Sequence, residues 1–262
     1  CVSGGKPEGR GGKEMTAKKM VRNIEPDDPM LQYSGRIDDD DPKAPVLIYA
    51  ASWVKMIFTG TSVAVTLANH HAYWTNEMGY LLDGVQGRIR LLNDGKKKTY
   101  EIAGQLPDAR HELMLFKRMD ACHTVTFYGF TVDGGADLLP PEPKPARRME
   151  VFGDSVSCGE VSEAVDYVGK EDPVHDGQYS NSWYSYAWMT ARKLGAELHD
   201  TSQGGIALLD GTGWFGAPAY YSVESCYDKL AYNPDLGEVK KWDFSRYTPQ
   251  VVVVAIGQND NH

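Results

Sequence analysis

Apolar and polar residues alternate in short runs between Val21 and Leu139, and most runs stop at a turn-forming residue. Short alternating runs rich in β-branched and aromatic side chains predict strands, and many of them in series are typical of a β-sandwich or jelly roll. The Asn93-Asp94-Gly95 sequence between two runs predicts a tight hairpin. We expect strands over residues 46–49, 54–58, 62–67, 80–82, 88–92, 112–116 and 124–130.

The pattern changes after Leu139-Pro-Pro-Glu-Pro-Lys-Pro145, where four prolines exclude a helix or a central strand. A helix is predicted from Asn181, which can cap it, to Leu194, with Trp183, Tyr186, Ala187, Thr190 and Leu194 on one side and Gly195 after its end. Residues 251–256 are apolar on both faces, as in a central parallel strand. Further strands are expected over residues 149–152 and 196–200, and strands that alternate with helices indicate an open α/β sheet.

These two sequence patterns divide the chain of 262 residues, which is long enough for two domains of ordinary size. Residues 1–20 show no apolar periodicity and are predicted to form a flexible tether. The four predicted parts are the tether at 1–20, a β-sandwich at 21–139, a proline-rich linker at 140–147 and an α/β domain at 148–262.

Composition narrows the classes of partner. The net charge of −9 argues against a basic surface for nucleic acid or an anionic membrane, and no apolar run is long enough to span a bilayer. The cysteines show no metal-binding spacing, so we expect buried, unreactive thiols and no metal. They are Cys1, Cys122, Cys158 and Cys226.

Cys1 and the Gly/Lys-rich residues after it resemble the start of a cleaved bacterial lipoprotein. The resemblance implies a secreted or cell-surface protein that is anchored through a lipid on Cys1. The alternative is that Cys1 marks only the boundary of a cloned or sequenced fragment. Mass spectrometry of the native protein distinguishes the two.

Three predicted strands of the α/β domain end in polar turns that contain glycine. These turns are Gly153-Asp-Ser155, Thr201-Ser-Gln-Gly-Gly205 and Gly257-Gln-Asn-Asp260. Ligands bind beyond the carboxyl ends of parallel strands, so we expect the turns to meet at one edge. A serine hydroxyl, a glycine N–H and an asparagine amide there would supply a nucleophile and an oxyanion hole for acyl transfer.

The same turns resemble the sequence blocks of SGNH (GDSL-type) hydrolases. Gly153-Asp-Ser-Val-Ser-Cys-Gly159 resembles the first block, and Gly257-Gln-Asn-Asp260 resembles the third. The closer likeness is to family 2 carbohydrate esterases, whose jelly roll precedes the hydrolase domain, and it covers residues 33–262. The resemblance implies a flavodoxin-like parallel sheet and removal of O-acetyl groups from plant polysaccharides such as xylan or mannan, without a cofactor.

Site roles follow from the resemblance. Ser155 is expected to be the nucleophile, and the backbone N–H groups of Ser155 and Gly205 with the Asn259 side chain are expected to hold the oxyanion. In the family the base is a histidine from a D-x-x-H block well after the third block. We expect this block after His262, with the sheet continuing there as well. The other histidines show no link to Ser155 in the sequence.

Three neighbouring residues have simpler expected roles. Asp154 adjoins the nucleophile and is expected to brace its turn by accepting backbone N–H bonds, not to act in catalysis. Trp214 and Phe215 follow the second turn, where their rings could stack on sugars or pack in the core.

Two other functions remain open from the sequence. The same site could act on other acyl esters, as in a lipase or thioesterase, with activity that rises with acyl length. Alternatively, the sandwich could bind glycan without turnover. Glycan binding that does not change in Ser155→Ala would favour this second alternative.

Overall fold

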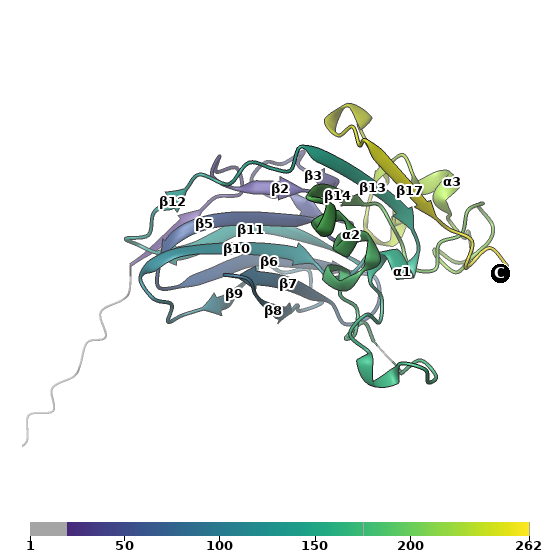
Figure 1. The fold of residues 1–262 in the computed structure, drawn as a ribbon, viewed down its shortest axis with the longest axis horizontal. Helices are drawn as coiled ribbons and strands as arrows, with labels where there is room; N and C mark the ends of the chain where they lie inside the picture. Colours follow the sequence, from purple (N-terminus) through teal and green to yellow (C-terminus); the bar gives the residue numbers. More distant parts are fainter. Residues whose placement is uncertain (1–19, 175, 262) are drawn as a thin grey trace, which may run out of the picture.

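The computed structural model describes residues 20–174 and 176–261. Cys1, nearly all of the predicted tether, His175 and His262 therefore lie outside the described residues. Two antiparallel sheets form a sandwich, and a parallel sheet with short helices packs at one end of it (Figure 1). The predicted fold class, a β-sandwich followed by an α/β parallel sheet, is confirmed.

Both sandwich sheets contain six strands in the described part of the chain. In the first, the order is β3-β4-β11-β6-β9, and β1 also pairs with β11. Its strands are β1 (Val21–Ile24), β3 (Ile37–Asp38), β4 (Val46–Leu47), β6 (Val63–His71), β9 (Lys98–Ala103) and β11 (His123–Asp133).

In the second sheet, the order is β12-β5-β10-β7-β8, and β2 also pairs with β5. Its strands are β2 (Gln32–Ser34), β5 (Trp53–Gly60), β7 (Glu77–Leu82), β8 (Val85–Arg90), β10 (Ala109–Lys117) and β12 (Leu138–Leu139). Apolar side chains from both sheets fill the space between them, including Phe58, Val65, Leu115 and Phe127.

The predicted hairpin at Asn93–Gly95 is wrong. β8 pairs with β7 in one sheet, whereas β9 pairs with β6 in the other, so this turn crosses between the sheets. The tight hairpin instead lies at Asp83 and Gly84, where Leu82 pairs with Val85 and both turn residues have positive φ. Two positive φ angles match the right-handed twist of the strands.

The parallel sheet has the order β14-β13-β17. Its strands are β13 (Arg147–Gly153), β14 (Ala196–Asp200) and β17 (Val251–Ala255), and a small hairpin of β15 (Lys229–Ala231) and β16 (Lys240–Lys241) lies beside it. Five consecutive residues of β13 are buried, as a strand covered on both faces requires. β17 is an edge strand in the described chain, and Val251, Val252 and Val254 are exposed.

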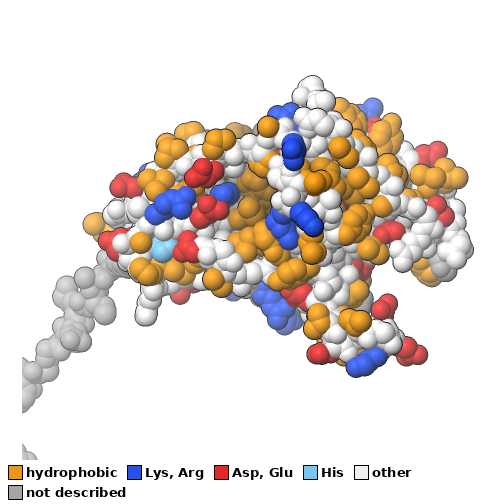
Figure 2. Space-filling view, in the orientation of Figure 1, with side chains coloured by type: hydrophobic (Ala, Val, Ile, Leu, Met, Phe, Trp, Pro, Cys, Tyr) orange, Lys and Arg blue, Asp and Glu red, His pale blue; other side chains and the backbone are white. Residues whose placement is uncertain are grey.

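The helices are α1 (Ser155–Cys158), α2 (Tyr186–Leu194) and α3 (Val223–Cys226). Single 3-10 turns are η1 (Val165–Tyr167), η2 (Ser182–Tyr184), η3 (Pro234–Leu236) and η4 (Phe244–Arg246). Figure 2 shows hydrophobic side chains gathered over α2 and β17, where Met189, Leu194 and the β17 valines are exposed.

The predicted helix over 181–194 is interrupted. Asn181 caps η2, and Ser185 takes an extended conformation and caps α2 through a hydrogen bond from the N–H of Trp188. Gly195 ends α2 in the left-handed conformation, as expected. The predicted face is wrong, because Ala187, Trp188 and Ala191 are the buried side chains of α2 whereas Leu194 is exposed.

Polar contacts join the sandwich to the parallel sheet. Arg36 of the sandwich forms a buried ion pair of 2.9 Å with Glu150 of β13 and donates to the carbonyl of Tyr227 at 2.8 Å. Ser182 beside α2 donates through its Oγ to the carbonyl of Lys117, the fully buried last residue of β10, at 2.6 Å. Because breaking such buried contacts is costly, they fix how the two layers sit against each other.

Candidate active site

The three predicted turns meet at one edge of the parallel sheet. β13 pairs in parallel with β14 on one side and with β17 on the other, so all three strands end in the same direction. The turn that carries Ser155 therefore lies between the other two. The Gln203 N–H donates to the Gly153 carbonyl at 3.1 Å, and the Asn259 Nδ2 donates to the Ile206 carbonyl at 3.0 Å.

Ser155 is the first residue of α1 and is half-buried. The strand can turn sharply into this helix because Gly153 has no side chain, and a Cβ there would lie 1.9 Å from the Ser157 Oγ. Asp154 caps the helix by accepting a hydrogen bond from the Val156 N–H at 3.1 Å, which confirms its expected bracing role. The first N–H groups of α1 therefore border the Ser155 hydroxyl.

Gly205 lies in the second turn with φ of +74°, a conformation that favours glycine. Its carbonyl accepts a hydrogen bond from the Trp214 N–H at 2.8 Å, while its own N–H donates to no acceptor in residues 20–174 and 176–261. A Cβ at Gly205 would lie 3.0 Å from the Trp214 Cβ. This N–H is therefore available to a ligand oxygen.

Asn259 lies in the third turn and contacts the second turn through its side chain. Its amide has two N–H donors, and the Ile206 carbonyl accepts one of them. The Asp260 carboxylate also accepts a hydrogen bond from the Leu208 N–H at 2.8 Å. These contacts hold the third turn against the second and leave one Asn259 donor for a ligand atom.

Asp120 reaches this edge from the sandwich, on the loop between β10 and β11. Its Oδ2 accepts hydrogen bonds from the Gly204 N–H at 2.6 Å and from the Gln203 Nε2 at 2.8 Å. Burial raises the pKa of Asp120, and the hydrogen bonds from Gly204 and Cys122 oppose that rise. Sequence reasoning missed Asp120, because no strand-end pattern connects it with turns that follow much later in the chain.

Glu160 follows the first block and was also missed. Burial and the Asp120 charge raise its pKa to about 7, although a hydrogen bond from Ser155 acts to lower it. A Cβ built on Gly204 would lie 2.8 Å from an Asp120 oxygen and 3.1 Å from a Glu160 oxygen. The two carboxyl groups thus flank the turn that carries Gly205. The closeness of these two carboxyl groups was the missing signal, and it depends on tertiary structure.

A cleft of about 380 Å³ opens beside these groups. Tyr73 and Trp74 line it from the sandwich, and Glu160, Gly205 and Trp214 line it from the other layer. The structure places the two aromatic candidates, Trp214 and Phe215, in different environments. Trp214 is 59% exposed, whereas Phe215 is 6% exposed and packs in a core with other apolar side chains, so we assign Phe215 to packing.

The five described histidines all lie on strands. His70, His71, His111 and His123 belong to sandwich strands. His199 is buried in β14 and stacks on Tyr247, as expected of a packed residue. In residues 20–174 and 176–261, the three cysteines are free and buried, and no group of histidine, cysteine and acidic side chains is arranged to hold a metal ion. No helix in these ranges is long and apolar enough to cross a membrane.

Residues 33–142 match the family model described as "Carbohydrate esterase 2 N-terminal". The chain is 33% identical over 235 residues to the cellulase/esterase CelE of Acetivibrio thermocellus, covering 89% of this chain and 27% of CelE. It is 27% identical over 242 residues to the acetylxylan esterase/glucomannan deacetylase of Cellvibrio japonicus, covering 92% of this chain and 64% of that protein. It therefore spans less than two thirds of either relative.

Among solved structures, the chain is similar to an active-site mutant of a family two carbohydrate esterase from Clostridium thermocellum, in complex with cellohexaose. The TM-score is 0.75 at 30% identity, over 89% of this chain and 67% of that one. The chain therefore belongs to carbohydrate esterase family 2.

Proposed function

We propose that this chain carries the nucleophile and oxyanion hole of a serine esterase that removes O-acetyl groups from plant cell-wall polysaccharide such as xylan or mannan. The meeting of the Ser155, Gly205 and Asn259 turns at one sheet edge carries the proposal. The kinship with an acetylxylan esterase/glucomannan deacetylase supports the acetyl group and the glycan.

In the proposed first step, the Ser155 oxygen attacks the acetyl carbonyl carbon. The Ser155 proton passes to a base, and the sugar oxygen leaves with a proton as the acetyl-enzyme forms. The N–H groups of Ser155 and Gly205 and the Asn259 amide stabilise the negative carbonyl oxygen. Water then attacks the acetyl-enzyme, which releases acetate and restores the Ser155 hydroxyl.

We further propose that the base is a histidine outside the described residues. The five described histidines all lie in the sandwich or under Tyr247. The test measures acetate release by residues 1–262 with and without added imidazole, beside the natural protein that contains this chain. Imidazole should restore activity to residues 1–262 if the base is missing. Full activity of these residues without imidazole, retained when His175 and His262 are both replaced by alanine, would contradict the proposal.

The cleft lined by Glu160 and Gly205 is the proposed glycan site, with the exposed Trp214 ring as a platform for a sugar face. The related esterase in complex with cellohexaose supports binding of a β-linked chain. Trp214→Ala should raise KM for acetylated xylan, while acetate release from a small acetyl ester should change little. Phe244→Ala is the matched control, because it also removes an exposed aromatic ring and Phe244 does not line the cleft.

The decisive experiment compares acetate release from acetylated xylan and mannan by the natural protein and by its Ser155→Ala variant. We expect the variant to lose at least a thousandfold in kcat. Ser245→Ala is the matched control, because Ser245 is exposed in η4, away from the three turns. Equal rates in Ser155→Ala and the unaltered protein would end the acyl-enzyme proposal. Activity that rises with acyl chain length would favour another ester substrate.

The lipid anchor on Cys1, and with it a secreted or cell-surface location, stays a prediction. Mass spectrometry of the N-terminal peptide from native protein tests it. An unmodified Cys1, or residues before it, would contradict the anchor.

A further inference from the structure

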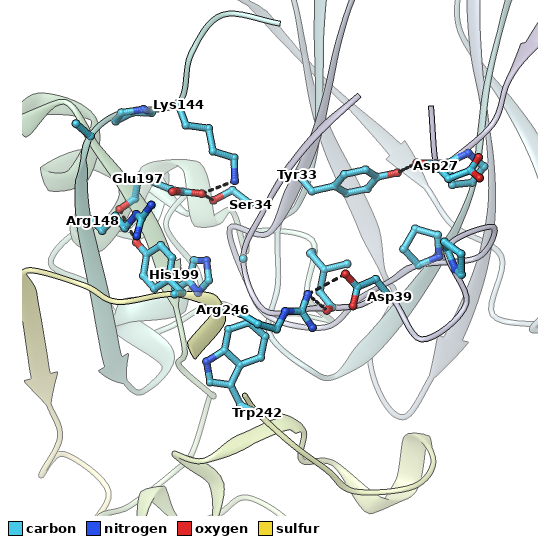
Figure 3. A pocket seen from close by; sticks show the side chains of 18 residues that line it. Asp27, Tyr33, Ser34, Asp39, Lys144, Arg148, Glu197, His199, Trp242 and Arg246 are labelled. Atoms are coloured by element: carbon cyan, nitrogen blue, oxygen red, sulfur yellow. Dashed lines mark hydrogen bonds and ion pairs between the residues drawn. The ribbon is translucent and has the colours of Figure 1, made fainter. Parts of the chain in front are cut away.

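A second cavity, of about 500 Å³, lies between the sandwich and the parallel sheet at the opposite end from Ser155 (Figure 3). Arg148 lines it at the start of β13, and Ser155 follows the end of the same strand. Seven residues of extended chain place the two about 23 Å apart. The volume falls within the usual range of about 300–1,000 Å³ for ligand pockets.

One wall of this cavity comes from the sandwich and is largely apolar. The Tyr33 ring projects from β2, and its hydroxyl donates to the Pro26 carbonyl at 2.7 Å, which fixes the ring. Pro42 and Pro45 lie on the same wall. A flat ring beside prolines suits the apolar face of a sugar or another ring.

The opposite wall carries the ion pair of Lys144 with Glu197, and a second pair joins Arg246 to Asp39 of the sandwich. Lys144 donates to Glu197 at 2.7 Å, and Arg246 donates to Asp39 at 2.9 Å. Each carboxylate has more acceptor sites than these bonds use. Glu197 and Asp39 can therefore still accept hydrogen bonds from ligand hydroxyl groups.

Arg148 is the unpaired cation of this wall. Its guanidinium makes no hydrogen bond or ion pair with any residue in the ranges 20–174 and 176–261, and it lies 5.7 Å from the centre of the Tyr247 ring. A guanidinium presents a planar fork of donors that fits a carboxylate. Arg148 is exposed where it lines the cavity, so its guanidinium can reach an anionic group of a bound ligand.

His199 also lines the cavity, beneath Arg148 and Arg246. It is 4% exposed, and its Nδ1 has no hydrogen-bond partner in the described chain. Burial lowers the pKa of His199 far below its ordinary value, and the charges of Arg36, Lys144, Arg246 and Arg148 lower it further. The field that disfavours an imidazolium here favours a bound anion.

We propose that this cavity binds a hexuronate, a carboxylate-bearing sugar unit of an acidic glycan. Arg148 pairs with the sugar carboxylate, the Tyr33 ring covers one sugar face, and Glu197 and Asp39 accept its hydroxyl groups. The site is separate from the acyl-transfer site and does not depend on Ser155. It would hold an acidic stretch of polysaccharide against the enzyme.

Calorimetric titration of residues 1–262 with glucuronate and with glucose tests the proposal. We expect glucuronate to bind and glucose to bind at least tenfold more weakly. Arg148→Gln should weaken glucuronate binding at least tenfold. Arg147→Gln is the matched control, because Arg147 precedes it, donates to the Leu194 carbonyl and does not line the cavity.

Two further measurements keep the outcome decisive. In the unaltered protein, glucuronate should shift the NMR signals of the His199 ring, a readout that needs no variant to fold. Ser155→Ala should bind glucuronate as tightly as the unaltered protein, so loss of esterase function and loss of this site can be told apart. Equal binding of glucose and glucuronate, an equal effect of the two arginine variants, or no binding of glucuronate at millimolar concentration would overturn the proposal.

Discussion

The Oδ2 atom of Asp120 lies 2.6 Å from the backbone nitrogen of Gly204. Asp120 belongs to the sandwich, and Gly204 precedes the proposed oxyanion residue Gly205. A buried carboxylate of one layer therefore sets the position of a turn in the other. The sandwich is thus part of the proposed active site as well as its neighbour.

Asp120→Asn should lower acetate release at least tenfold and leave KM nearly unchanged. An asparagine side chain presents one oxygen, so it cannot accept all the N–H bonds that the two Asp120 oxygens accept from Gly204, Gln203 and Cys122. The free energy of unfolding should fall by about 1–3 kcal/mol. Asp94→Asn, in an exposed turn of the same domain, is the control. Unchanged kcat in Asp120→Asn would refute the positioning role.

Glu160→Gln should change how stability depends on pH. The pKa of Glu160 is raised to about 7 from its ordinary value of 4.5, so ionisation is costlier in the folded state. The stability that Glu160 contributes is complete below about pH 4.5 and is lost as the pH rises through about 7. Urea unfolding should therefore find the variant more stable than the unaltered protein at pH 8, with a smaller difference at pH 5. Glu238→Gln, an exposed carboxyl, should show no such trend.

Asn259→Ala should reduce kcat for acetate release by about 10²–10³, the usual effect of removing one oxyanion donor. KM should change only a few-fold, because the donor acts on charge that develops during the reaction. The neighbouring Gln258 is exposed, and Gln258→Ala should keep full activity. A similar loss in both variants would point to damage of the turn instead.

Gly205→Ala should be more harmful than Gly84→Ala, although both glycines have positive φ, +74° and +80°. A Cβ at Gly84 meets no atom within 4 Å, whereas at Gly205 it lies 3.0 Å from the Trp214 Cβ. The Gly84 variant measures only the cost in folding free energy of a positive φ angle at alanine, about 1 kcal/mol. Acetate release and the thermal unfolding midpoint should both fall further in the Gly205 variant. Equal effects would show that the Trp214 side chain shifts at little cost to make room for the added Cβ.

Local signals in the chain predicted much of the fold. The runs that became β5, β6, β10 and β11 are long enough to specify strands, and Gly195 ends a helix as its backbone freedom allows. Which strands pair with each other in a sheet was harder to predict. Asn93–Gly95 and Asp83–Gly84 both have hairpin chemistry, yet only the second joins neighbouring strands, because the first connects different sheets.

The sequence by itself determined the three glycine-bearing turns and their order after apolar strands, because turn chemistry and strand pattern are local properties. It also determined that Asp154 braces the turn at Ser155 by accepting a backbone hydrogen bond. Only the tertiary structure decided that Asp120 and Glu160 flank Gly204, that Phe215 packs while Trp214 faces the cleft, and that Arg148 lies unpaired beside a cavity. Those relationships join residues far apart in the chain, and burial, charge pairing and pKa depend on the whole packed environment.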